Sequence, residues 1–277
     1  MKSYSNIISL NTNSRGVSII DPSMGCVSGL INDANGCYSD CYSAKSAKIY
    51  GYDFSKTVLR NFKDEKHRRK IVQQISRLKL PFVRMGGSGD PSENWDHTIS
   101  ICDAIKHCNK EIVIITKHWT KLSETHLAMI SKMNICINTS VSALDNLDVL
   151  AENLYQYSRI KPFCKSVLRV VSCNFNKENE TGKRLSDIQD SLFENSNVID
   201  TVFRPSKNNR LLLNGVILAK DGFFNGSKTF MSQRSRKVFT GHCSKCSEMC
   251  GVSIGINVDT KMPIPIYVQS EIKPIRK

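Results

Sequence analysis

The sequence predicts an α/β fold in which a parallel sheet curves into an incomplete barrel. Short apolar runs rich in β-branched residues alternate with segments of helical periodicity, and the alternation repeats six times before Pro205. Strands that alternate with helices form right-handed βαβ units around a parallel sheet, and six units make a partial (βα)6 TIM-like barrel. We therefore expect a barrel domain over residues 1–205 and a C-terminal cysteine-bearing extension over residues 206–277.

Six apolar runs are the predicted strands. The first, GVSIID, is short, and a loop that contains cysteines follows it directly. The third, EIVIITK, is the clearest buried strand, because its apolar residues are continuous, as in strands covered on both faces. The predicted strands cover residues 16–21, 81–85, 111–117, 134–141, 165–173 and 198–204.

Helical segments separate these runs. In the second segment one helical face carries Ile71, Val72, Ile75 and Leu78. The charged run KDEKHRRK within this segment is expected to form a solvated helix start. Ser123 is placed to cap the helix after the third strand. The predicted helices cover residues 42–50, 63–78, 95–108, 122–132, 144–157 and 182–194.

Composition limits the class of protein. Of 277 residues, 40% are hydrophobic and 23% are charged, so the chain can bury a full core. The 39 lysines and arginines exceed the 25 aspartates and glutamates by 39 − 25 = 14, which favours a polyanionic partner such as nucleic acid. No apolar run approaches the roughly 20 residues of a membrane span, and residues 1–13 lack a secretory signal. We expect a cytoplasmic protein whose thiols stay reduced.

Six of the eleven cysteines gather in two loop segments, and the other five stand singly in or beside apolar stretches. Single cysteines of this kind are expected to be small buried hydrophobic residues. Loops allow several sulfurs to converge on one point, so we expect each group of three to bind metal. The first group is Cys26, Cys37 and Cys41, and the second group is Cys243, Cys246 and Cys250.

The first group has three cysteines and no nearby histidine, which favours an iron–sulfur cluster with one open iron over structural zinc. Here the sequence resembles the radical S-adenosylmethionine (SAM) superfamily, in which a cluster-binding CxxxC after the first strand is followed by an aromatic residue, one more residue and a third cysteine. Cys37, Cys41 and Tyr42 match, but Ala44 occupies the third position. With Cys26 as the substitute, the spacing Cys-x10-Cys-x3-Cys is similar to a branch frequent in phage genomes.

The resemblance implies how SAM is held. Three irons of a [4Fe-4S] cluster would be bound by the first group, and the fourth would bind the amino and carboxylate groups of SAM, with Tyr42 beside the adenine. The turn GGSGDP after the second strand resembles a Gly-Gly-Glu-type turn whose carbonyls hold the SAM amino group, although an ordinary βα turn is the alternative. Arg169 is a candidate for the SAM carboxylate or for an internal acidic residue. With Ser140, which is a candidate from its place near the end of the fourth strand, the candidate cofactor-binding residues are Tyr42, Gly86, Gly87, Ser88, Gly89, Asp90, Ser140 and Arg169.

Four further residues are weaker candidates to face the cavity, because ligand groups collect at the carboxyl ends of barrel strands. They are Thr116, Lys117, Asn138 and Arg204.

The second group is compatible with two kinds of site. Many proteins that resemble this superfamily carry an auxiliary iron–sulfur cluster after the barrel, and the three cysteines would hold it. Alternatively, the three thiolates and the adjacent His242 form a zinc ligand set. The spacing does not separate these possibilities, but the helix-poor tail favours the auxiliary [4Fe-4S] cluster.

The predicted function is therefore a radical SAM enzyme. It would receive an electron from a donor such as flavodoxin or ferredoxin, cleave SAM to a 5′-deoxyadenosyl radical and modify a substrate. The net charge of +14 favours a nucleic acid as that substrate, although a peptide or small metabolite fits nearly as well. The alternative is a zinc-stabilised nucleic-acid-binding protein without catalysis. No GxxxxGK[ST] or HExxH motif occurs, which argues against a P-loop NTPase and a zinc hydrolase.

Overall fold

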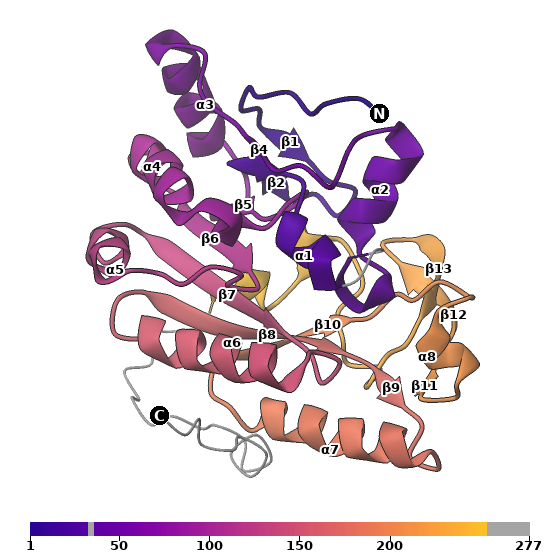
Figure 1. The fold of residues 1–277 in the computed structure, drawn as a ribbon. Coiled ribbons are helices and arrows are strands. Elements are labelled where there is room, and N and C mark those ends of the chain that lie inside the picture. Colours follow the sequence, from indigo (N-terminus) through magenta and orange to yellow (C-terminus); the bar gives the residue numbers. More distant parts are fainter. Residues whose placement is uncertain (33–35, 254–277) are drawn as a thin grey trace.

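A computed structural model describes residues 1–32 and 36–253, so the last part of the predicted extension, residues 254–277, lies outside the described residues. Its centre is a seven-stranded sheet in the order β1-β2-β5-β6-β7-β8-β10 (Figure 1). The six strands from β2 to β10 are parallel to their neighbours, whereas β1 pairs with β2 in the antiparallel direction. These strands are β1 (Asn11–Thr12), β2 (Ser18–Ile19), β5 (Phe82–Met85), β6 (Glu111–Thr116), β7 (Ile135–Val141), β8 (Lys165–Ser172) and β10 (Val198–Val202).

The predicted α/β partial barrel is confirmed, because the six parallel strands are the six predicted runs. The run that forms β6 is buried at five of its six positions, as expected for a parallel strand that is covered on both faces. β10 ends at Val202, earlier than predicted, because its neighbour β8 ends at Ser172, the residue paired with Val202.

Helices follow the strands and cover the outer side of the sheet, where α3 to α7 lie in succession (Figure 1). Side-chain caps decide where three of them begin. Asp64, Asn146 and Asn179 each accept a hydrogen bond from a backbone N–H of the following turn, so α3, α6 and α7 start directly after these residues. The predicted cap Ser123 forms a capping box with His126. The helices are α2 (Tyr42–Tyr50), α3 (Glu65–Ser76), α4 (Trp95–Ile105), α5 (Glu124–Ile130), α6 (Leu147–Ile160) and α7 (Glu180–Phe193).

The first cysteine segment contains short elements of its own. α1 (Val27–Asn32) follows Cys26, and the 3-10 turn η1 (Cys37–Ser39) precedes α2. A two-stranded ladder of β3 (Ser23–Met24) and β4 (Val58–Leu59) closes the segment at its base. These short elements and α2 make up the chain between β2 and α3.

The chain after β10 packs back on the barrel. α8 (Arg210–Leu213) is followed by β11 (Ile217–Leu218), which pairs with β9 (Asn174–Phe175), and then by the hairpin of β12 (Lys220–Phe224) and β13 (Ser227–Met231). Asn225 and Gly226 turn the hairpin with φ values of 53° and 80°, as in the tight turns that favour Asn-Gly. A bridge between Phe203 and Ser232 joins the end of the hairpin to the chain just after β10.

The barrel interior is closed at the end where the parallel strands begin. Inward-facing residues near the strand starts form one apolar cluster with Cys243 from the short η3 (Cys243–Lys245), and Met249 and Cys250 from η4 (Met249–Gly251) pack against it. The strand residues of this cluster are Val17, Phe82, Val113, Cys136, Val167 and Ile199. Cys243 and Cys250 of the second cysteine group therefore help to close this end of the barrel. We call residues 243–252, which cover it, the C-terminal plug.

Four of the five single cysteines are buried, as predicted, and Cys164 is partly exposed. In the described part of the chain no helix is long and apolar enough to cross a membrane.

Candidate functional site

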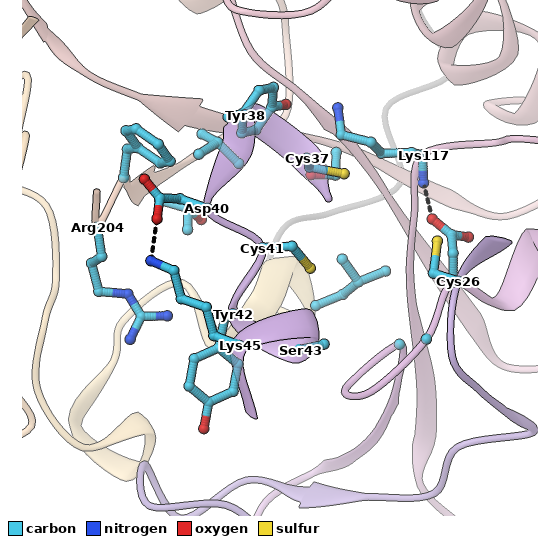
Figure 2. A pocket seen from close by; sticks show the side chains of 18 of the residues that line it. Cys26, Cys37, Tyr38, Asp40, Cys41, Tyr42, Ser43, Lys45, Lys117 and Arg204 are labelled. Carbon is cyan, nitrogen blue, oxygen red and sulfur yellow. Dashed lines mark hydrogen bonds and ion pairs between the residues drawn. The ribbon is translucent and has the colours of Figure 1, made fainter. Parts of the chain in front are cut away.

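A cavity of about 450 Å³ opens at the carboxyl ends of the parallel strands (Figure 2). The first cysteine segment, the Gly-rich turn after β5, the ends of β6, β7, β8 and β10, and the β12–β13 hairpin form its walls. Ligand sites of βα barrels occur at this end because the loops after the strands converge there. Eight of the predicted cluster- and cofactor-binding residues line the cavity: Cys26, Cys37, Cys41, Tyr42, Gly86, Gly89, Asp90 and Ser140. Of the four weaker candidates, Thr116, Lys117 and Arg204 line it and Asn138 does not.

The three cysteines of the first group face this cavity, and two glycines leave room around their sulfurs (Figure 2). A Cβ atom at Gly29 would lie 2.9 Å from the Sγ of Cys26 and 3.9 Å from the Sγ of Cys37, so both sulfurs flank this glycine. A Cβ atom at Gly36 would lie 2.4 Å from the Cβ of Cys41 and 3.4 Å from its Sγ. The glycines therefore form a cradle that any larger residue would fill.

A strained turn brings Cys37 and Cys41 to the same cavity. Tyr38 and Ser39 both adopt positive φ values, 59° and 60°, which are uncommon for residues other than glycine. The carboxylate of Asp40 anchors the turn to the segment after β10, because it accepts hydrogen bonds from the N–H and the hydroxyl of Ser206. Strain of this kind persists only where the surrounding contacts hold it, and it is common at functional sites.

The protein surroundings of Cys26 and Cys37 favour the neutral thiol over the thiolate. Burial raises the pKa of Cys37 to about 12, although the nearby Lys117 ammonium opposes this effect. Burial likewise raises the pKa of Cys26, and the negative charge of Asp90 adds to the rise. Thiols in such surroundings become thiolates when a metal cation replaces the proton. The donor set, three thiols without an imidazole, fits an iron–sulfur cluster with one open iron.

Glu93 is a neighbour of Cys26 that no sequence motif singles out. Its Oε1 accepts hydrogen bonds from the N–H of Ser28 at 3.0 Å and from the Sγ of Cys26 at 3.5 Å. It belongs to the short η2 (Pro91–Asn94) directly after the Gly-rich turn. A carboxylate therefore lies against one sulfur of the first group.

Asp21 binds the backbone of the Gly-rich turn, and the sequence alone did not single it out. Its Oδ1 accepts hydrogen bonds from the N–H groups of Gly86 at 2.9 Å and Gly87 at 2.8 Å. Gly86 has a φ of 86°, and a Cβ atom there would lie 2.3 Å from the carbonyl oxygen of Ile115, so only glycine fits. The sequence feature that could have identified Asp21 is its position at the end of the first predicted strand, GVSIID.

The structure places Gly87 and Ser88 in this turn but not in the cavity lining. The hydroxyl of Ser43 donates to the carbonyl of Gly87 at 2.9 Å, and the N–H of Gly25 donates to the carbonyl of Ser88 at 3.0 Å. Both donors flank the first cysteine group in the sequence. These two carbonyls therefore bind the cysteine segment to the turn.

Asp90 lines the cavity, but its carboxylate is fully engaged within the protein. Oδ1 accepts from the N–H and hydroxyl of Ser92 and from the hydroxyl of Thr116, and Oδ2 accepts from the N–H of Lys117 at 2.8 Å. Burial raises the pKa of Asp90, while these hydrogen bonds oppose the rise. Asp90 therefore ties the end of β6 to the Gly-rich turn.

Ser140 and Arg169 are register partners on β7 and β8, but only Ser140 lines the cavity. Arg169 lies in the barrel interior, where its Nη1 donates to the Oδ1 of Asn138 at 3.5 Å. Burial raises the pKa of Glu248 in the C-terminal plug, and the positive charge of Arg169 opposes that rise. The hydrogen-bond partner of Arg169 is thus an amide, and its acidic neighbour comes from the plug.

The second cysteine group lies at the opposite end of the barrel from the cavity. Cys243 is buried among the strand starts, and the carbonyl of Cys250 accepts a hydrogen bond from Asn138 at 3.0 Å. Burial raises the pKa of Cys243, while the positive charges of Arg15 and Arg84 lower it. His242 uses its Nδ1 to pair with the hydroxyl of Ser244 at 2.8 Å.

Within the described residues, no three His, Cys, Asp or Glu side chains are close enough to surround one metal ion. Each thiolate that holds a four-iron cluster binds an iron of its own, so such ligands stand further apart than the ligands of a single ion.

No protein-family model and no curated protein matches the chain. Among solved structures, it is similar to a variant of spore photoproduct lyase with bound AdoMet and dinucleoside spore photoproduct. The TM-score is 0.50 and the sequence identity is 12%, over 83% of this chain and 72% of that chain. The likeness shows that this chain shares the α/β partial-barrel fold of that lyase.

Proposed function

We propose that this protein is a radical SAM enzyme that holds a [4Fe-4S] cluster through Cys26, Cys37 and Cys41. The observation that carries the proposal is that these three thiols line one cavity at the carboxyl ends of six parallel strands. The shared fold of a lyase solved with bound AdoMet supports it. When bound, the cluster and SAM supply reductive cleavage of SAM to a 5′-deoxyadenosyl radical that abstracts a substrate hydrogen.

The upstream position of Cys26 is compatible with this role. Cys26 belongs to the same apolar cluster as Cys41 and Ala44, the residue that occupies the third position of the usual motif. A Cβ atom at Gly36 would lie 3.7 Å from the Cβ of Ala44 and 3.4 Å from the Sγ of Cys41. The shared apolar cluster supports the proposal that Cys26 takes the part of the usual third cysteine, as in the branch with a displaced triad.

The remaining cavity residues would bind and orient SAM. Tyr42 would lie beside the adenine, while the backbone of Gly86 and Gly89 and the hydroxyl of Ser140 present polar groups to the cavity. Apolar side chains such as Ile115 and Val171 complete the walls and would keep water from a reactive radical. Gly87, Ser88 and Asp90 would act by positioning the turn.

The proposed substrate is a nucleic acid. The net charge of +14 supports a polyanionic substrate, and the lyase of similar fold was solved with a dinucleoside photoproduct. The proposal requires a reducing partner such as flavodoxin or ferredoxin and places the protein in the cytoplasm, where thiols remain reduced.

The second group is proposed to hold a metal that stabilises the closed end of the barrel, either an auxiliary [4Fe-4S] cluster or zinc with His242 as a ligand. Arg15 and Arg84 support an anionic thiolate site there, because their charges favour the thiolate of Cys243. Iron and zinc analysis of the Cys243→Ala variant distinguishes the two: the lost metal is the metal of this site.

Anaerobic purification and reconstitution test the function. We expect a brown protein with about four or eight irons per chain and formation of 5′-deoxyadenosine from SAM in the presence of dithionite. Cys26→Ala should lose about four irons and SAM cleavage, whereas Cys164→Ala, a cysteine outside both groups, should retain both. A colourless protein with stoichiometric zinc and no SAM cleavage would reject the enzyme in favour of a zinc-stabilised nucleic-acid-binding protein.

A further inference from the structure

Three cationic side chains line the cavity, and two of them are neutralised by carboxylates. Lys45 forms an ion pair with Asp40, and Lys117 forms a buried ion pair with Asp145 at 2.5 Å. The third cation, Arg204, follows β10 and forms no ion pair or hydrogen bond with any side chain in residues 1–32 and 36–253. Its guanidinium therefore brings an uncompensated positive charge to the cavity wall.

Aromatic rings hold the guanidinium of Arg204 in place. Its Cζ lies 5.3 Å from the ring centroid of Tyr42 and 4.2 Å from that of Phe224, which comes from the β12–β13 hairpin. Arg15 lies over the same Phe224 ring at 4.7 Å, so a second guanidinium is close by. Burial and the charge of Arg15 both lower the pKa of Arg204, and only the weakly acidic Tyr42 opposes them. A bound anion would relieve this unfavourable charge.

Arg204 also lies away from the cavity wall that carries Cys26. Figure 2 shows Arg204 and Cys26 on opposite sides of the cavity, with Asp40, Lys45 and Tyr42 beside Arg204. Under the proposed function, the carboxylate of SAM binds the open iron and so lies near the cysteines. An anion at Arg204 would then belong to the substrate.

We propose that Arg204 binds a phosphate group of a nucleic-acid substrate at the mouth of the cavity. The inference rests on the proposed function and adds a residue that would contact the substrate. A guanidinium offers several N–H donors in a planar fork that matches phosphate oxygens, and stacking on Tyr42 and Phe224 leaves the edge of that fork for the ligand.

Binding of a fluorescein-labelled 12-nucleotide single strand, as DNA and as RNA, tests the proposal by fluorescence anisotropy between 50 and 200 mM salt. Arg204→Gln should weaken binding about tenfold or more and reduce the slope of log K against log salt by about 1. The matched control Lys220→Gln removes an exposed cation of the hairpin and should change the affinity by less than about twofold. Arg204→Lys should keep the salt slope but lose part of the affinity, because the fork is gone.

SAM binding to the reconstituted variants, measured by equilibrium dialysis, identifies the source of the anion. Retained SAM binding by Arg204→Gln, with weakened oligonucleotide binding, supports the proposal. Lost SAM binding by Arg204→Gln with unchanged oligonucleotide affinity would overturn the proposal and assign Arg204 to the SAM carboxylate. A wild-type chain that binds neither the DNA nor the RNA strand would also overturn it. Oligonucleotide binding can be measured before the cluster is reconstituted, whereas iron content reports whether the cluster is bound. A negative result for Arg204 is therefore distinguishable from a negative result for the proposed function.

Discussion

The carboxylate of Asp21, just after β2, accepts a hydrogen bond from the N–H of Gly86 at 2.9 Å. Gly86 begins the turn after β5, so this bond crosses between the first two parallel strands at their carboxyl ends. β2 and β5 share only one register pair, Ile19 with Arg84. The side chain of Asp21 therefore replaces the ladder hydrogen bonds that the short β2 does not provide.

Replacing Asp21 should loosen this turn. Asp21→Ala leaves two backbone N–H groups without their acceptor and should lower the free energy of unfolding by about 2 kcal/mol. Asp21→Asn keeps an acceptor oxygen and should cost less than about 1 kcal/mol. Urea unfolding of the three proteins measures both values. Equal losses in the two variants would show that the charge, and not the acceptor, holds the turn.

His118 should make stability depend on pH. The imidazole is buried after β6, its Nε2 pairs with the hydroxyl of Thr139 at 3.0 Å, and burial lowers its pKa to about 3 from the usual 6.5. The unfolded chain therefore binds one more proton between these two values, and stability should fall as the pH decreases from 6.5 toward 3. The slope for one histidine is at most about 1.4 kcal/mol per pH unit.

Urea unfolding of wild type and His118→Gln between pH 4.5 and 7.5 measures this contribution. Glutamine can still pair with Thr139 but does not titrate in this range. The difference in free energy between the two proteins should therefore change with pH below 6.5, by up to the stated slope, and level off above it. A difference that is constant across the range would contradict a neutral buried His118.

The barrel was predictable because its strands are buried on both faces. The run that forms β6 has a continuous apolar centre, IVII, and strands β7 and β8 are largely buried in the same way. The alternation with helices therefore appears directly in the sequence. The first residues of the helices were less predictable, because they depend on which polar residue caps the first turn. Asn146 and Asn179 cap α6 and α7, but neither residue interrupts the apolar periodicity around it, so the pattern does not mark where the helix begins.

The cavity residues were predictable only where they belong to a motif or end a strand. The cysteines and the Gly-rich turn stand out in a loop, whereas Asp21 and Glu93 act through contacts with residues 65 or more positions away in the chain. Sequence spacing carries no information about such contacts. The opposite placement of the two cysteine groups was unpredictable for the same reason, because it depends on how the chain after β10 returns to the strand starts.

The charge of Glu93 should tune a cluster held by Cys26. The carboxylate lies 3.5 Å from the sulfur, and a reduced cluster carries one more negative charge than an oxidised one. Glu93→Gln removes the repulsion and should raise the reduction potential by on the order of tens of millivolts. Redox titration followed by electron paramagnetic resonance measures it. Glu178→Gln, at an exposed position, is the control and should leave the potential unchanged.

Gly51 and Gly86 both have positive φ values, so their substitution by alanine distinguishes backbone strain from steric exclusion. Gly51 has a φ of 73° and no atom within 4 Å of the place that a Cβ would take, whereas Gly86 has a φ of 86° and the carbonyl oxygen of Ile115 at 2.3 Å from that place. Gly51→Ala should lower the free energy of unfolding by about 1 kcal/mol through φ strain alone. Gly86→Ala adds displacement of the turn and should cost at least twice as much and weaken SAM binding. Equal costs in urea unfolding, with unchanged SAM binding, would mean that the turn after β5 can move without loss, against its role as the support of the site.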